Sequence, residues 1–122
     1  MTQEQIIFYV VYVVMPAAGY LLGSIPFALL IGKANGVDIR TVGSKNIGAT
    51  NLGRALGPKF FLHAFLLDAA KGFLPVLIVS LTLRQWNAQA GVVMVASWAP
   101  LATVVACVIG HMFPVWLRFK GG

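Results

Sequence analysis

Three long runs of apolar residues alternate with polar stretches along the chain. The runs cover residues 6–31, 60–83 and 92–117, and each exceeds the roughly 20 residues that a helix needs to cross a bilayer. The first run contains Pro16 and the stretch GSIPF at residues 23–27, which can kink or interrupt a helix whose neighbours satisfy the freed backbone groups. The pattern predicts an all-α integral membrane protein: a multipass helical bundle, in one transmembrane domain, with three transmembrane helices in this segment.

A polar loop at residues 33–59 joins the first two runs and is much longer than a connection between two helices requires. Apolar residues recur along it, which indicates that the loop packs as a structure of its own. They are Val37, Ile39, Val42, Ile47, Leu52 and Leu56. Thr50 or Asn51 is the expected N-cap of a short helix containing LGRAL, and Gly57 with Pro58 is expected to end that helix.

The charge distribution predicts how the chain lies in the membrane. Only 10% of the residues are charged, against about 25% in an average soluble domain, and 59% are hydrophobic. Five of the nine basic residues lie in the polar loop, namely Lys33, Arg40, Lys45, Arg54 and Lys59. This is the positive-inside pattern, so we expect an external N-terminus and place the loop and the C-terminal RFKGG in the cytoplasm. The same distribution argues against nucleic acid as a partner.

The richest polar stretch is SKNIGATNLGRALG at residues 44–57. A helix that starts after Gly48 leaves backbone N–H groups unpaired in its first turn, and its dipole favours an anion there. Arg54 adds a planar guanidinium suited to phosphate. Neutral donors are supplied by Ser44, Asn46 and Asn51. The stretch indicates a phosphate site at the membrane surface, although a capped glycine-rich turn with Arg54 and Lys45 as topological charges explains the same residues.

A second polar cluster, GHMFPVWLRFKGG at residues 110–122, ends the chain. His111 stands at the expected helix end, where its simplest role is that of an interfacial imidazole beside belt aromatics and topological cations. Gly121 and Gly122, which follow a basic aromatic stretch, also have the character of an anion-binding turn. We therefore expect the chain to be the N-terminal part of a longer protein.

Both clusters resemble the bacterial acyl-phosphate-dependent glycerol-3-phosphate acyltransferases, the PlsY family of integral membrane enzymes. The resemblance covers nearly all of the chain, in the expected order, through the blocks LLGSIPFALLIGK, GVDIRTVGSKNIGATNLGRALG, LLDAAKGFLP and GHMFPVWLRFKGG. GSKNIGATN is highly specific, and the last block is nearly so. Family members continue past the double glycine into KGVAT-like sequence, further spans and a third motif, so the resemblance implies that these 122 residues alone are inactive.

The resemblance implies transfer of a fatty acyl group from acyl phosphate to the 1-hydroxyl of sn-glycerol 3-phosphate. The products would be lysophosphatidic acid and phosphate, in the first step of bacterial phospholipid synthesis, at the inner membrane. The family motifs imply catalytic roles for Ser44, Arg54 and His111. The implied substrate-binding residues are Asn46, Gly48, Thr50, Asn51, Gly121 and Gly122.

The implied chemistry suits these residue types. Acyl phosphate has a good leaving group, so the enzyme needs mainly to hold two phosphates, orient a hydroxyl and stabilise an oxyanion. Backbone N–H groups, asparagines and an arginine can do this, and no His or carboxylate cluster has metal-ligand spacing. We therefore expect no metal and no other cofactor. The acyl tail would stay in the lipid bilayer while both phosphates sit in the basic loop.

The main alternative is a small multipass anion transporter or channel component, which would bind an anion without chemistry. An alcohol phosphatidyltransferase would need an acidic metal-binding cluster that three dispersed carboxylates cannot supply. HAFLLD at residues 63–68 matches the H-x-x-x-x-D of unrelated acyltransferases, but helix positions five apart point about 140° away from each other. Asp68 and Lys71 can neutralise each other as a tether to the active-site loop, or they can contact substrate directly.

Overall fold

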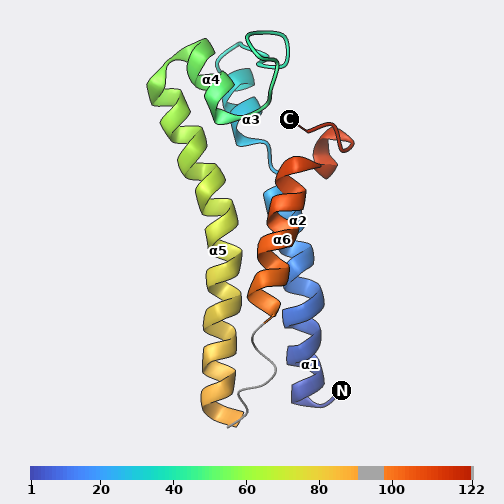
Figure 1. Ribbon diagram of the computed structural model, residues 1–122. Coiled ribbons are helices and arrows are strands. Elements are labelled where there is room, and N and C mark those ends of the chain that lie inside the picture. Colours follow the sequence, from blue (N-terminus) through green and yellow to red (C-terminus); the bar gives the residue numbers. More distant parts are fainter. Residues whose placement is uncertain (91–97, 122) are drawn as a thin grey trace.

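The protein, seen in a computed structural model that describes residues 1–90 and 98–121, is helical in all its regular elements within these ranges (Figure 1). The elements are α1 (Gln3–Tyr9), the π-helical turn η1 (Val10–Val14), α2 (Met15–Gly23), α3 (Phe27–Ala34), α4 (Ala49–Leu56), α5 (Pro58–Ala90), α6 (Ala99–Met112) and the 3₁₀ turn η2 (Val115–Leu117). Three helical stretches are long and apolar enough to cross a membrane: Gln3–Ala34, Pro58–Gln89 and Ala99–Leu117. The predicted all-α fold with three such helices is confirmed.

A break between α2 and α3 interrupts the first of these stretches. Pro26 lies at φ −88° and ψ 75°, outside the helical region, and α3 begins at the next residue. Just before the break, Ser24 donates from both N and Oγ to Tyr20 O, at 2.9 and 2.8 Å. The interruption expected at GSIPF is therefore confirmed. Pro16 causes no such break, because it lies in the first turn of α2, directly after the wider π-helical turn.

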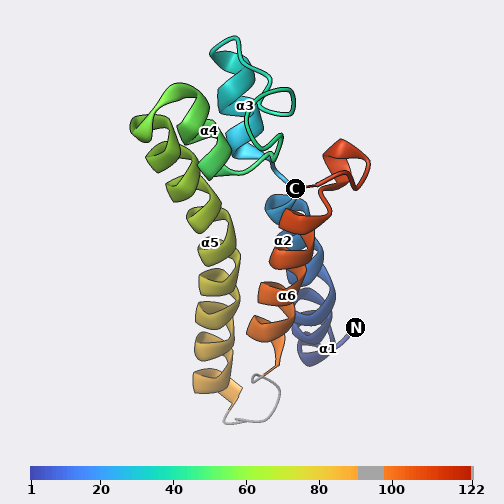
Figure 2. The same ribbon diagram turned by 45° about the horizontal axis from the view of Figure 1, so that its top comes forward.

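Small residues bring α2 and α6 close together (Figures 1 and 2). A Cβ built on Gly23 would lie 2.3 Å from Cys107 O, and one on Gly110 would lie 2.2 Å from Tyr20 O. Only glycine fits at both positions, so the two backbones touch, as they do in many pairs of membrane helices. Large apolar side chains face outward instead, such as Phe65, Phe73 and Val108, which are 52, 64 and 52% exposed.

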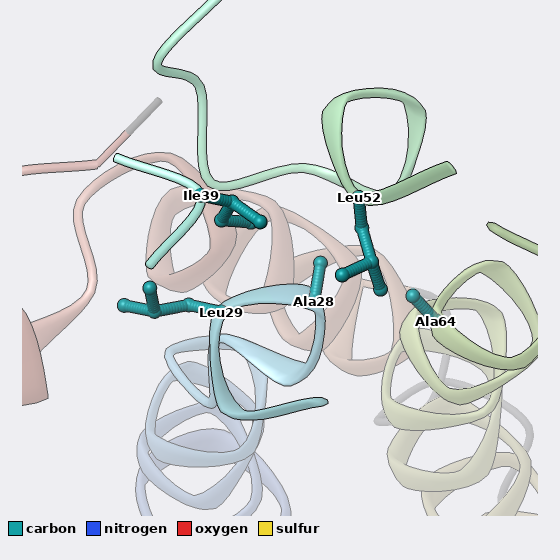
Figure 3. Packing of buried hydrophobic residues seen from close by; sticks show 5 residues of the cluster. All are labelled: Ala28, Leu29, Ile39, Leu52 and Ala64. Atoms are coloured by element: carbon teal, nitrogen blue, oxygen red, sulfur yellow. The ribbon is translucent and has the colours of Figure 1, made fainter. Parts of the chain in front are cut away.

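The polar loop folds into a small cap with a core of its own, as its apolar residues predict. Figure 3 shows this core, to which α3 contributes Ala28 and Leu29, the segment after α3 contributes Ile39, and α4 and the start of α5 contribute Leu52 and Ala64. Burial of a side chain such as Ile39 or Leu52 stabilises the cap by about 1.5–3 kcal/mol. Val37, Ile47 and Leu56 pack against it, whereas Val42 is 36% exposed and does not contribute.

The short helix of the loop is confirmed as α4, but its predicted N-cap is wrong. Gly48, not Thr50 or Asn51, occupies the N-cap position, because the helix already begins at Ala49. Gly57 ends α4 at φ 106°, a conformation that favours glycine, and Pro58 starts α5.

The other helix boundaries differ from the predicted spans by several residues. Helix α5 extends to Ala90, beyond the predicted 60–83, because its polar last turns have no helix breaker. The predicted start of the third span at residue 92 lies outside the described residues, and α6 begins at Ala99. The N-terminus and the end of α5 lie at one end of the molecule, and the cap and the C-terminal segment at the other (Figures 1 and 2). The two polar clusters thus meet at one end.

Candidate active site

A pocket of about 120 Å³ lies where the helix break, the cap, α5 and α6 meet. Its walls are residues 23–27 of the break, residues 46–48 of the loop, Asp68 and Lys71 of α5, and His111 with Pro114. A water molecule takes up about 30 Å³ in the liquid, so the pocket holds a small polar group or a few waters and is too small for an acyl chain.

Lys71 and Asp68 form an ion pair in the wall of this pocket. Lys71 Nζ lies 2.7 Å from Asp68 Oδ1, and the two side chains are only 6% and 19% exposed. Nζ also donates to Ile25 O at 2.7 Å and lies 5.6 Å from the ring centre of Phe27. The mutual neutralisation expected from the sequence is present. The backbone that Lys71 holds, however, belongs to the helix break and not to the loop at residues 33–59.

The start of α4 borders the pocket as well. Gly48 is both the N-cap of α4 and part of the pocket wall, and no side chain of the described residues caps this helix. Asn46 Oδ1 accepts a hydrogen bond from Gly48 N at 2.9 Å, which fixes the turn that leads into α4. The first-turn N–H groups of a helix carry partial positive charge, so this edge of the pocket favours an anion.

Asn51 faces into the cap, where its side chain is 2% exposed. Its Nδ2 group donates to the carbonyls of Ile39, Asn46 and Val42, at 2.7, 2.9 and 3.1 Å. Its Oδ1 accepts from Ser44 N at 3.1 Å. Both the Nδ2 and the Oδ1 atom of Asn51 are thus hydrogen-bonded to the loop backbone, so this side chain shapes residues 44–46. The asparagine that lines the pocket is Asn46.

Ser44, Thr50 and Arg54 lie outside the pocket, with exposed side chains. Thr50 and Arg54 line a second, more open hollow of about 260 Å³, together with Gly53, Pro58 and Phe61. The structure therefore brings Asn46, Gly48 and His111 together, and it places Thr50 and Arg54 on a separate surface of α4.

The segment after α6 forms a tight turn. Arg118 and Phe119 both have left-handed backbone conformations, with φ of 53° and 63°. A Cβ on Gly121 would lie 1.9 Å from Met112 O, so only glycine allows this close return of the chain. Gly122 lies outside the described residues.

One cation of the loop is already paired. Arg40 Nη2 lies 2.6 Å from Asp38 Oδ2, and Nε donates to both carboxylate oxygens, at 2.9 and 3.2 Å. These hydrogen bonds favour the charged carboxylate and lower the pKa of Asp38 to about 2, and they raise the pKa of Arg40. The other loop cations, Lys33, Lys45, Arg54 and Lys59, are exposed and form no ion pair within the described residues.

The H-x-x-x-x-D alternative does not form a pair. His63 lines an apolar hollow with Ile31 and Asn35, whereas Asp68 lines the polar pocket, so the two side chains face different parts of the molecule. Within the described residues, no three His, Cys, Asp or Glu side chains gather into a group that could hold a metal ion.

Comparison with known proteins identifies the family. Residues 13–122 match the sequence model described as glycerol-3-phosphate acyltransferase. The chain belongs to this family. Glycerol-3-phosphate acyltransferases of Anaeromyxobacter dehalogenans strain 2CP-C and Aquifex aeolicus strain VF5 are 50% identical to it over 110 residues and 48% over 103. These matches cover 89% and 84% of the chain but 51% and 48% of the relatives, so the chain spans about half the length of the curated relatives it matches.

Solved structures of the acyltransferase family share the fold. The chain resembles two crystal structures of PlsY, an integral membrane glycerol 3-phosphate acyltransferase, in its glycerol 3-phosphate form and its lysophosphatidic acid form. The TM-scores are 0.73 and 0.71, at 46% and 44% identity, over 89% of this chain and 50% and 48% of those chains. The resemblance carried by the motifs is confirmed, and these comparisons give the transporter alternative no support.

Sequence reasoning left the helix break out of the site, and it named the ion pair only as a tether or a substrate contact. The signals were present, because GSIPF marks a break and Asp68 and Lys71 are charges in an apolar run. That all three meet beside Asn46 and His111 depends on how the helices pack.

Proposed function

We propose that this chain carries part of the active site of an acyltransferase that uses acyl phosphate and glycerol 3-phosphate. The fatty acyl group passes to the 1-hydroxyl of sn-glycerol 3-phosphate, and lysophosphatidic acid and phosphate are formed. The observation that carries this proposal is the family match over residues 13–122, which includes both polar clusters. The choice of acyl phosphate as donor rests on the motif GSKNIGATN and its resemblance to the PlsY family.

The pocket suits one phosphate group of the two substrates. The start of α4 offers backbone N–H groups, Asn46 and Gly48 shape that edge, and His111 lines the same pocket from α6. Arg54 and Thr50 on the neighbouring hollow, with Ser44 on the loop, are assigned to the second phosphate. Asn51 supports this arrangement from within the cap, and Gly121 extends it from the C-terminal turn. Gly122 is assigned to substrate binding by the family motif alone.

Because acyl phosphate has a good leaving group, the reaction depends more on the orientation of the hydroxyl group than on its activation by a strong base. The 1-hydroxyl oxygen attacks the acyl carbonyl carbon, the bond from that carbon to the phosphate oxygen breaks, and the hydroxyl proton leaves through His111 or with the phosphate. N–H and guanidinium donors stabilise the oxyanion that forms between these steps, so the proposal includes no metal or other cofactor.

The same proposal places the protein in the bacterial inner membrane. The N-terminus lies outside, the loop at residues 33–59 lies in the cytoplasm, and the acyl tail stays in the bilayer beside the pocket. The cap and the C-terminal segment share one end of the molecule, which supports a single face for both substrates (Figure 1).

The test compares Arg54→Lys with Lys45→Ala in the complete gene product that contains this chain. Lysine keeps the charge of Arg54 but loses the paired N–H donors, so we expect activity to fall by about 10–100-fold. Lys45→Ala should stay within about 2-fold, because an exposed single charge contributes little. The assay follows release of phosphate and formation of lysophosphatidic acid in lipid vesicles. Absence of both products with the unmodified protein would overturn the proposed function.

A further inference from the structure

We infer that Lys71 is a positioning residue, which holds the break between α2 and α3 in the shape that the pocket requires. The inference rests on the proposed function, since it assigns to Lys71 a part in the acyl transfer that this pocket would perform. Lys71 acts through the backbone of Ile25, to which Nζ donates at 2.7 Å.

The helix break is a wall of the pocket, and its position is not fixed by helical hydrogen bonds alone. Residues 23–27 line the pocket together with residues 46–48. Pro26 has no N–H group, and Phe27 N reaches Ile25 O only across a short turn, at 3.1 Å. The hydrogen bond from Lys71 is the shorter of the two to Ile25 O. It ties the break to α5.

The other side of the break is tied to the segment after α6. Trp116 Nε1 donates to Leu21 O at 3.3 Å, and the Tyr20 hydroxyl donates to Phe113 O at 3.0 Å. The C-terminal segment therefore contacts α2 just before the break, and Lys71 ties the break itself to α5. Together these bonds fix the pocket wall at residues 23–27 relative to α5 and the segment after α6.

The surroundings of Lys71 fit a positioning role better than a direct contact with substrate. The Lys71 ammonium group donates a hydrogen bond to Ile25 O and forms an ion pair with Asp68, so it is already occupied by the protein. The side chain is 6% exposed, and the Phe27 ring lies over it. Asp68, one turn earlier on α5, pairs with the Lys71 ammonium group, which offsets the cost of burying an unpaired charge in a membrane-length helix.

A double substitution separates positioning from mere charge neutralisation. Replacing a buried ion pair by apolar residues of similar volume often leaves a fold as stable as before. In Asp68→Leu/Lys71→Met both charges are gone, and the hydrogen bond that ties the Ile25 carbonyl to α5 is gone with them, which leaves this carbonyl with the short turn bond from Phe27 N. If the ion pair has no role beyond the mutual neutralisation of the Asp68 and Lys71 charges, this variant keeps full activity. If Lys71 positions the break, the variant folds but turns over slowly.

The kinetic experiment uses the complete gene product in lipid vesicles. We expect the double variant to lose about 10-fold or more in kcat, with KM for both substrates within about 3-fold, because orientation is lost and binding is not. Arg84→Met, which removes an exposed cation near the other end of the same helix, should match the unmodified protein. A double variant with unchanged kcat would overturn the inference, and so would a large rise in KM with kcat retained, because that result marks a direct substrate ligand.

A second readout does not depend on acyl transfer. Ser24, in the break, is 1% exposed, and Ala64, in the core of the cap, is 0% exposed. Each is replaced by cysteine in a Cys107→Ala background, with and without Lys71→Met, and its rate of reaction with a maleimide is measured. We expect Lys71→Met to raise labelling at position 24 by about 5-fold or more and to leave position 64 unchanged, as local opening requires.

The labelling outcomes decide the inference even if the protein shows no acyltransferase activity. Unchanged labelling at position 24 means that Lys71 does not hold the break. Equal increases at positions 24 and 64 mean that the variant unfolds as a whole and that the pair is only structural. Either result overturns the inference, whereas failure of the proposed function would appear separately, as missing products with the unmodified protein.

Discussion

At the scale of single residues, two asparagines of one motif have different surroundings. Asn46 lines the pocket and fixes the turn before α4, whereas Asn51 is buried and binds the loop backbone. The side chain of Asn51 meets three carbonyl groups and one N–H group, so it replaces the backbone hydrogen bonds that an irregular segment lacks. The shape of the loop beside the pocket depends on this one amide.

Asn51→Ala should therefore loosen the loop without disturbing the membrane helices. Loss of several buried hydrogen bonds predicts a destabilisation of the cap by about 2–4 kcal/mol. Hydrogen exchange at the Ser44 amide, which is bonded to Asn51 Oδ1, measures the effect and should become faster. Asn35→Ala serves as the control, because the Asn35 side chain is exposed and makes a single bond to Ile31 O. Equal exchange at Ser44 in all three proteins would contradict this assignment.

The Asp38 carboxyl group predicts how the loop responds to acid. Its pKa is lowered to about 2 in the folded protein, from an ordinary value of 3.8, by hydrogen bonds from Arg40. The contribution of the pair to stability is thus present above about pH 4 and is lost as the pH falls through about 2. Titration of the Asp38 carboxyl carbon by NMR should show a midpoint near the lower value, and Arg40→Gln should shift the midpoint towards 3.8. A midpoint that Arg40→Gln leaves unchanged would show that the pair does not form in solution.

At the scale of helices, the contact between α2 and α6 depends on glycines, which have no side chain beyond hydrogen. A Cβ on Gly110 would lie 2.2 Å from Tyr20 O and 3.0 Å from Ser24 N, so the helices can approach only because position 110 carries no side chain. This contact also fixes where α6 ends and where His111 stands relative to the break.

Gly110→Ala should push α6 away from α2 and lower the free energy of unfolding by at least about 1–3 kcal/mol. Gly72→Ala is the matched control, because a Cβ there meets no atom within 4 Å and alanine favours the helix. Thermal unfolding can be followed with a dye that reacts with Cys107, a thiol that is 5% exposed in the folded protein. A stability of Gly110→Ala equal to that of Gly72→Ala would show that the two helices are not in backbone contact.

The helices were predictable from the sequence to the extent that local chemistry determines them. Long apolar runs and Pro26 were enough to predict the three membrane-length helices and the break. The N-cap of α4 was not predictable, because Thr50 and Asn51 are better caps by residue type, and tertiary contacts of Asn51 decide the outcome. The motif also marked Asn46, Gly48 and His111 for the site, but their meeting with Lys71 depends on helix packing.

At the scale of the whole molecule, polar groups gather at one end. The cap, which carries the exposed cations Lys33, Lys45, Arg54 and Lys59, and the turn after α6 lie together, and the start of α1 and the end of α5 lie at the opposite end (Figures 1 and 2). The basic residues that cluster in the loop at residues 33–59 of the sequence therefore lie at the same end of the molecule as the C-terminal segment. It also means that one orientation in the membrane determines the side of every residue assigned to the site.

Single cysteines at positions 3, 45 and 89, in a Cys107→Ala background, test that orientation in cells. Gln3, Lys45 and Gln89 are all exposed, so a membrane-impermeant maleimide can reach each of them from its own side. The positive-inside rule keeps the basic loop in the cytoplasm, because translocation of clustered Lys and Arg is disfavoured. We expect external reagent to label positions 3 and 89 and to label position 45 only after the membrane is permeabilised. Labelling of position 45 in intact cells would reverse the orientation, and different labelling of positions 3 and 89 would contradict their placement at the same end, since both must then lie on the same side of the bilayer.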